Sequence, residues 1–190
     1  AARGLGDVYK RQDPSFARPY GYLALTLSRG ANANSRLALP NIDSESAAYM
    51  ADILSLASIS GGPNIPQTYF SRAFIETFRL GDHQAALNNV NIALSLNPSY
   101  ADALGLKASI QTFIQNPDEA LKVIDRAKQL NPNFSVEYLQ IEAIALIMLG
   151  QWEAAKQTAS LAVERLPEST NSRIILMCAD FYVGNIDDAL

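Results

Sequence analysis

One pattern of small and apolar residues occurs three times along the chain and restricts what the chain can fold into. Ala86, Val90, Ala93 and Pro98 are separated by steps of four, three and five residues. The same steps join Ala120, Ile124, Ala127 and Pro132, and then Ala155, Ala159, Ala162 and Pro167. Copies at a near-constant period predict a stack of structural repeats, in which each unit packs mainly on its neighbours.

Each copy of the pattern has the spacing of an α-helix. Steps of four and three place Ala86, Val90 and Ala93 on one stripe, and small residues there let a neighbouring helix approach to the low end of the roughly 8–10 Å interaxial range. The proline that follows cannot continue a helix, so we expect the helix to end just before it. Each unit is predicted as a helix, a short turn, a second helix and a longer turn.

The short turns carry the residues that end one helix and start the next. Gly81, Gly150 and Gly184 each precede an alanine by five residues, and glycine suits the left-handed conformation at a helix C-terminus. Asp82 and Asn116 can cap the helix that follows with a side-chain oxygen. The predicted helices are 67–80, 83–96, 101–114, 117–130, 135–149, 152–165, 170–183 and the start of another at 186.

A less regular helix pair is predicted before residue 66. Helices at about 16–29 and 44–59 flank a loop at 29–41 that is rich in asparagine, with Gly30 and Pro40, and Gly61-Gly62-Pro63 ends the second helix. The side chains expected to face inward are Tyr20, Leu23, Ala24 and Leu27 on the first helix and Ala48, Ala51, Ile53 and Leu54 on the second.

The two ends of the chain predict a fragment. Residues 4–12 read GLGDVYKRQ, which looks like translated sequencing-adapter read-through, so we expect residues 1–12 to be non-natural and disordered. Residues 13–16 repeat the turn motif and suggest the end of a preceding unit. A helix pair that stops at Leu190 leaves one helix face without its partner.

The repeat resembles the tetratricopeptide repeat, a 34-residue helix-turn-helix unit with small residues near positions 8, 20 and 27 and proline near position 32. The resemblance implies an all-α solenoid with a right-handed superhelix. It divides the chain into a leader at 1–12, a degenerate repeat with a long loop at 13–66, and repeats at 67–190. Those repeats are 67–100, 101–134, 136–169 and a partial one at 170–190. The chain departs from the family at Phe74, where a small residue is usual, and at Gln115, where glycine is usual.

In this family the first helix of each unit lines the concave face, with positions 2, 5, 9, 12 and 13 pointing into the groove. Carried over by position, the first unit supplies Thr68, Ser71, Ile75, Phe78 and Arg79. The next two supply Asp102, Gly105, Ser109, Thr112 and Phe113, then Glu137, Gln140, Ile144, Ile147 and Met148. Burial between the two helix layers is the competing interpretation for Ile75, Ile144 and Ile147, because a phase error of one residue exchanges the groove set for the buried set. The sites in the family that hold carboxylate tails use basic and amide clusters, and only Arg79 fits that pattern.

Composition argues against several other functions. The net charge of −4 disfavours binding driven by nucleic-acid phosphates. His83, in a tight turn, has no accompanying nucleophile or second base, and one His and one Cys do not provide metal-ligand spacing. We expect Cys178 to be buried and inert, Trp152 to pack beside its turn, and Asp187-Asp188 to complement a helix N-terminus. The longest uncharged apolar run, 143–149, is too short to span a bilayer, and the single cysteine favours a reducing, cytoplasmic location, with the periplasm as the second possibility.

The predicted function is non-catalytic protein–protein interaction. The groove would dock a peptide, a partner protein or a neighbouring domain of the parent chain, with no cofactor, metal, nucleic acid or membrane. Residues 13–24, followed by a long loop and repeats, are similar to bacterial repeat regions attached to class III adenylate or guanylate cyclase domains or to winged-helix regulators. Such a resemblance implies a sensory or regulatory role. Two competing hypotheses are an enzyme with its site in a solenoid cavity, which requires converging ionisable groups, and a structural assembly module.

Overall fold

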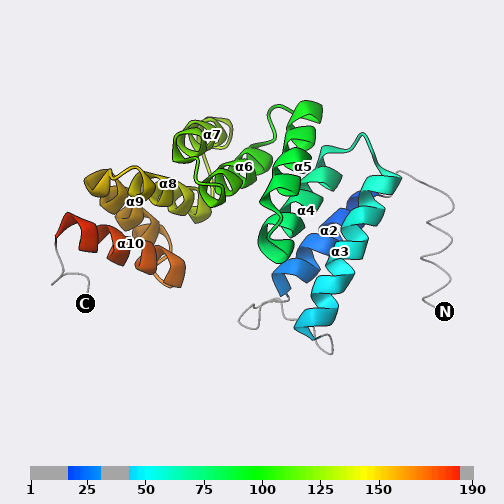
Figure 1. Cartoon of the computed structure of the whole chain (residues 1–190), viewed down its shortest axis with the longest axis horizontal. Helices are drawn as coiled ribbons and strands as arrows, with labels where there is room; N and C mark the ends of the chain where they lie inside the picture. The colour runs from blue at the N-terminus through cyan, green and yellow to red at the C-terminus, as the bar shows by residue number, and fades with distance from the viewer. Residues whose placement is uncertain (1–16, 31–42, 185–190) are drawn as a thin grey trace. The chain divides into compact units, whose positions relative to one another are not determined.

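The computed structural model describes residues 17–30 and 43–184, and within these residues all regular structure is helical (Figure 1). The observed helix ends lie within two residues of the predicted ones. The predictions that concern the leader, residues 13–16, most of the 29–41 loop, the helix from 186 and Asp187-Asp188 fall outside the described residues. The helices are α2 (Ala17–Gly30), α3 (Ser44–Gly61), α4 (Pro66–Ile75) with the π-helix η1 (Glu76–Leu80), α5 (His83–Leu96), α6 (Ala101–Phe113), α7 (Pro117–Leu130), α8 (Val136–Met148), α9 (Trp152–Arg165) and α10 (Thr170–Val183).

The short turns end helices as the sequence predicts. Gly81, Gly150 and Gly184 have φ of 69°, 71° and 87°, and Gln115 takes the same left-handed conformation with φ of 58°. A side chain with a Cβ is strained in this conformation. The conformation of Gln115 therefore explains why glycine is usual at its position in the family. The Asp82 carboxylate accepts a hydrogen bond from the Ala85 N–H at 3.0 Å and caps α5.

The cap predicted for Asn116 is wrong. Its side chain makes no capping hydrogen bond, and α7 begins instead with Pro117 in the first turn. Proline has no N–H to satisfy and has a φ suited to the first helical position, so this helix can start without a side-chain cap.

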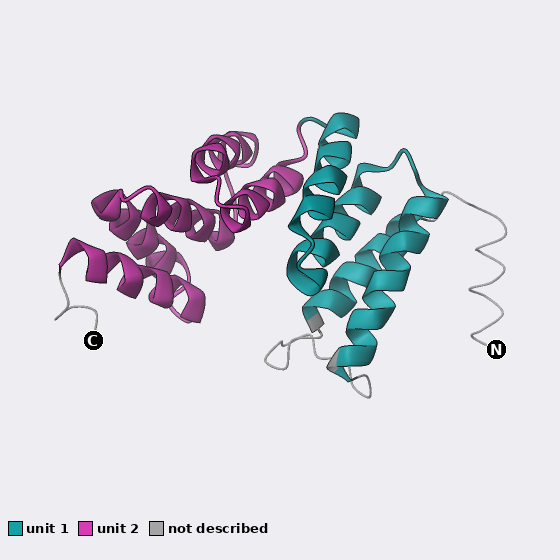
Figure 2. Cartoon of the chain, in the orientation of Figure 1, with its two compact units in different colours: residues 1–98 teal, residues 99–190 magenta. Residues whose placement is uncertain are grey.

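The chain divides into two compact units, residues 1–98 and residues 99–190 (Figure 2). In the first, α2 packs against α3 and α4, α3 against α4, and α4 against α5. In the second, each helix from α6 to α10 packs against the next, and α8 also contacts both α6 and α10. The first helices of successive pairs therefore lie side by side in the second unit, as in a helical solenoid.

The stripe of small residues forms seams between packed helices in both units. Apart from its prolines, the repeated pattern has nine residues, and each is at most 1% exposed: Ala86, Val90, Ala93, Ala120, Ile124, Ala127, Ala155, Ala159 and Ala162. This confirms the central prediction from the repeat. Close approach at an alanine seam leaves no room for a larger side chain, which explains why the pattern recurs at these positions.

Polar side chains connect the degenerate pair to the first regular repeat. Arg72 on α4 donates to Asp52 and, at 3.1 Å, to Ser55 on α3, and its Nε donates to Glu76 at 2.7 Å. Asn89 on α5 donates to the other Glu76 oxygen at 2.8 Å. Burial disfavours the charge on Arg72, but the hydrogen bonds to Asp52 and Glu76 outweigh that effect and raise its pKa above the usual value.

Three predictions of buried faces are wrong. Leu23 and Ile53 are 47% and 46% exposed, while Ala47, which the sequence analysis did not place inside, is 3% exposed and joins the core with Ala24, Leu27, Ala51 and Ile75. Cys178 is exposed, and the buried residues of α10 are Ser172, Ala179 and Asp180. An apolar helical stripe indicates which residues share a face but not whether another helix covers that face.

Candidate functional site

The candidate site is the layer formed by α6, α8 and α10 in the second unit. The predicted groove residues occupy matching positions on α6 and α8. On each helix, the first and last of them are eleven residues apart. Asp102, Phe113, Glu137, Ile144 and Met148 are exposed. Ser109, Thr112, Gln140 and Ile147 are half-buried at the edges of the same face.

Three of the predicted groove residues have a structural role. Gly105 is buried, and a Cβ on it would come within 2.7 Å of the Tyr138 ring, so this glycine makes room for the neighbouring helix. The Gln140 amide donates to Ser172 at 2.8 Å and to Ser169 at 3.1 Å, and this links α8 to the start of α10. The Thr112 hydroxyl donates to the backbone carbonyl of Ser109 at 2.7 Å.

The helix α10 extends the same face, and the sequence analysis missed it. Ile174, Phe181 and Tyr182 are 51%, 58% and 53% exposed, and they share a helical face with Cys178. Tyr182 stacks on Trp152 with ring centroids 4.3 Å apart, which confirms that Trp152 packs beside its turn. The same positional frame applied to residues 170–182 would have identified these residues.

Two carboxylates border this face at the beginning of its helices. Asp102 and Glu137 occupy the first turns of α6 and α8, and Glu137 directly precedes the buried Tyr138. Burial, with a further contribution from these two negative charges, raises the pKa of Tyr138 to about 12. The Tyr138 hydroxyl donates to the Ala101 carbonyl at 2.9 Å, so the phenol is held neutral.

Comparison with solved structures identifies the fold of the chain. A tetratricopeptide repeat protein from Parabacteroides merdae matches with a TM-score of 0.65 and 23% identity, over 76% of this chain and 56% of its own length. TTC0263, a tetratricopeptide protein of Thermus thermophilus, has a TM-score of 0.66 and 18% identity, over 76% of this chain and 79% of its own. YrrB, described as a tetratricopeptide protein with an unusual peptide-binding site, has a TM-score of 0.62 and 17% identity, over 95% and 84%.

The chain has a tetratricopeptide-type fold. No protein-family model matches the sequence. The resemblance is therefore one of structure, carried by the helix pairs and their alanine seams. At this level of identity, it establishes the all-α solenoid and leaves the partner to be argued from this chain's own residues.

The first regular tetratricopeptide unit departs from the predicted phase. Thr68, Ser71 and Ile75 are at most 1% exposed, so they belong to the core and do not line a groove. Phe78 is 47% exposed. Arg79 is half-buried, and its guanidinium donates to the hydroxyl of Ser28 at 3.2 Å and to the Ser28 carbonyl, which fastens it to the last turns of α2.

The π-helix η1 explains this shift. Tetratricopeptide position 8 is Ala108 in the second unit and Ala143 in the third, each seven residues before its left-handed residue at 115 or 150. In the first unit the fully buried alanine is Ala73, eight residues before Gly81. The first unit thus has one more residue between its buried alanine and its left-handed residue, and the wide turn of η1 accommodates it. The repeat positions before η1 therefore lie one residue earlier in the sequence than predicted. Phe74 is no longer a departure, because Ala73 occupies the small-residue position.

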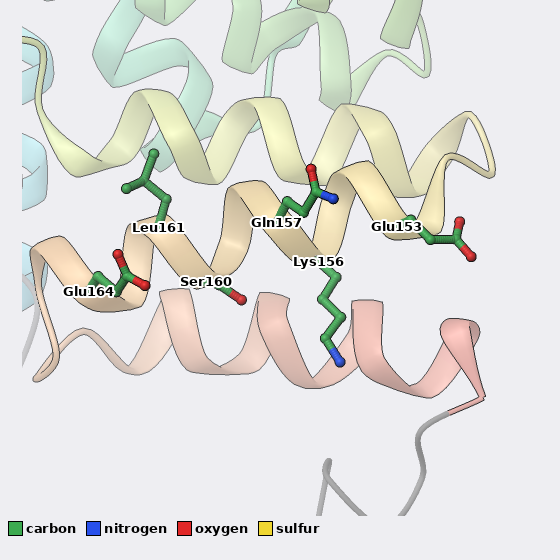
Figure 3. A pocket seen from close by; sticks show the side chains of 6 residues that line it. All are labelled: Glu153, Lys156, Gln157, Ser160, Leu161 and Glu164. Carbon is green, nitrogen blue, oxygen red and sulfur yellow. The ribbon is translucent and has the colours of Figure 1, made fainter.

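An open depression lies on α9, away from the residues that the sequence predicted (Figure 3). The residues that line it lie along one helical face: Glu153, Lys156, Gln157, Ser160, Leu161 and Glu164. Lys156 forms an ion pair with Asp180 on α10 at 2.6 Å. A single helix supplies the whole lining, so it offers no convergence of groups from several elements.

The histidine considered for catalysis and metal binding lies on a helix outside the candidate face. His83 is the first residue of α5 and is half-buried. Within residues 17–30 and 43–184, no three His, Cys, Asp or Glu side chains are placed to hold a metal ion. No helix in these ranges is long and apolar enough to cross a bilayer.

Proposed function

We propose that this chain is a non-catalytic scaffold that binds a peptide, a partner protein or another domain of its parent chain through the α6–α8–α10 face. The observation that carries the proposal is the row of large apolar side chains exposed on this face. They are Phe113, Ile144, Met148, Ile174, Phe181 and Tyr182, which are 36–58% exposed. Apolar area removed from water is worth roughly 25 cal/mol per Å², so such a row favours docking.

Side-chain contacts between the helices hold the framework of this face, which favours affinity. Tyr138 packs against Gly105, Gln140 bonds the start of α10, and Trp152 stacks on Tyr182. A preformed surface loses little conformational entropy on binding. The description of YrrB as having a peptide-binding site supports the same class of function.

An enzyme is disfavoured, because the charged residues on this face are the two carboxylates Asp102 and Glu137, without a nucleophile or base beside them. The net charge of −4 disfavours nucleic acid as the partner. A regulatory role beside a bacterial nucleotide cyclase or winged-helix domain stays a prediction from residues 13–24, as does a cytoplasmic location.

A peptide-display selection on the whole chain tests the proposal. We expect the wild-type protein to enrich a set of related peptides, and Ile144→Ser/Met148→Ser to bind them at least tenfold more weakly because two exposed apolar contacts are lost. Leu161→Ser on α9 is the control, because Leu161 is 40% exposed and Met148 38%. Far-UV circular dichroism checks that all three proteins are equally helical. Equal weakening by the control, or no enrichment at all, would refute the proposal.

A further inference from the structure

The two ends of the α6–α8–α10 face differ in chemistry. Asp102 and Glu137 lie in the first turns of α6 and α8, and both are exposed. Phe113 and Met148, also exposed, end the same two helices. Eleven residues separate the first and last members on each helix, which is about 16 Å at 1.5 Å per residue. The face is therefore acidic at one edge and apolar at the other.

Asp102 and Glu137 are in none of the ion pairs found among residues 17–30 and 43–184. In the second unit, Lys128 pairs with Glu142 and Lys156 with Asp180, so neither lysine is paired with the acidic edge. The Tyr138 hydroxyl bonds the Ala101 carbonyl at 2.9 Å and so joins the first turns of α6 and α8. Asp102 follows Ala101 and Glu137 precedes Tyr138, so the two carboxylates lie on neighbouring first turns. Two negative charges on neighbouring helix turns favour the binding of a positively charged group from a partner.

The remaining positions of the face add no competing positive charge. Its other members on α6 and α8 are uncharged, and those on α10 are Asn171, Ile174, Cys178, Phe181 and Tyr182. A partner that fits must cover the apolar edge with apolar side chains and bring a cation to the acidic edge. Opposite charges across an interface mainly raise the association rate and the specificity, and salt screens their effect.

We infer that the partner of this face is an amphipathic peptide segment with large apolar side chains at one end and lysine or arginine at the other. The inference rests on the proposed function and adds the chemistry of the partner. The distance of about 16 Å between the two edges corresponds to about five residues of extended chain or about eleven of helix. A segment with that spacing reaches both edges at once.

Fluorescence anisotropy with the full chain and synthetic peptides tests the inference. The parent probe carries three large apolar residues, a five-residue polar spacer and two lysines, and the second probe has glutamates in place of the lysines. We expect the lysine probe to bind at least tenfold tighter at 50 mM NaCl, with a smaller ratio at 300 mM. Asp102→Asn/Glu137→Gln is expected to remove most of that preference. A helical pair of probes with an eleven-residue spacing is measured in parallel.

A charge-matched control separates local from global electrostatics. Asp125→Asn/Glu164→Gln removes the same net charge from exposed positions on α7 and α9, and we expect it to keep the preference. Equal binding of the lysine and glutamate probes, or equal effects of the two double variants, would overturn the inference while leaving apolar docking intact. No binding of any probe would also overturn it, and the display selection would then decide separately whether the face docks peptides.

Discussion

Tyr138 packs α8 against α6 in the second unit and lies beside the acidic edge. Its ring fills the space that Gly105 leaves open, stacks on Phe134 with centroids 5.7 Å apart, and its hydroxyl bonds the Ala101 carbonyl. Burial is the main reason that its pKa rises to about 12. Ionising this phenol in the folded state is unfavourable, because the charge would be poorly hydrated.

This pKa predicts how stability depends on alkaline pH. An unfolded tyrosine ionises near pH 10, so the folded protein binds more protons between about pH 10 and 12 and its stability falls across that window. The contribution is fully present below pH 10. We expect Tyr138→Phe to cost about 1 kcal/mol at pH 8, from the lost hydrogen bond, and to lose less stability than wild type from pH 10 to 11.5. Urea denaturation at a series of pH values measures both; parallel curves would contradict the assignment.

At the level of single helices, η1 shows how the chain accommodates one additional residue. Glu76 keeps its bonds to Arg72 and Asn89, while the Thr77 hydroxyl bonds only within the helix, to the Ala73 carbonyl at 2.7 Å. The residues before and after the wide turn keep their positions in the core. The turn is thus a place where the helix can absorb a change of length.

Deletion of Thr77 is expected to convert η1 into ordinary α-helix and to leave the first unit folded. Deletion of Ser71, before the turn, rotates the buried residues on one side of it by about 100° and is expected to unfold that unit. Thermal unfolding followed by circular dichroism compares the two proteins. Equal loss of the folded state in both would show that η1 does not absorb the extra residue.

The sequence predicts helix ends well because their signals are local. Pro117 and the glycines at 81, 150 and 184 act within one turn, and every described helix ends within two residues of its prediction. The groove residues of the first unit could not be predicted, because an insertion inside a helix leaves the flanking motifs unchanged. The groove prediction for Ser71 is therefore wrong, and for Ile75 the competing interpretation, burial, is confirmed. The contact of Arg79 with Ser28 spans 51 residues and has no local signature.

At the scale of the whole molecule, packing divides the chain at one of the predicted repeat boundaries, between residues 98 and 99. The first unit has a core around Leu27, Ala51 and Ile75, and the second has its own contacts around Leu146, Ala155 and Ala179. Repeat proteins are stabilised mainly by contacts between adjacent elements, so a local defect need not spread to a unit with a separate core.

Gly105→Ala tests that independence. The added methyl group would lie 2.7 Å from Tyr138, and such overpacking typically costs about 1–3 kcal/mol. We expect faster amide hydrogen exchange throughout α6–α10 and unchanged protection in α2–α5. Ser109→Ala on the same helix is the control, since it removes an atom instead of adding one. A uniform increase along the chain would indicate that the two units unfold together.

The bonds of Arg72 to Asp52 and Glu76 determine how segments of this chain can be exchanged with those of related proteins. A chimera joined near residue 66 would separate Asp52 from its arginine. The guanidinium of Arg72 is half-buried, and losing one of its two carboxylates would destabilise the folded unit because its charge is then less well compensated. The smallest transferable module at this end is therefore the helical block through Pro98, although the repeat motif by itself would place a junction thirty-odd residues earlier.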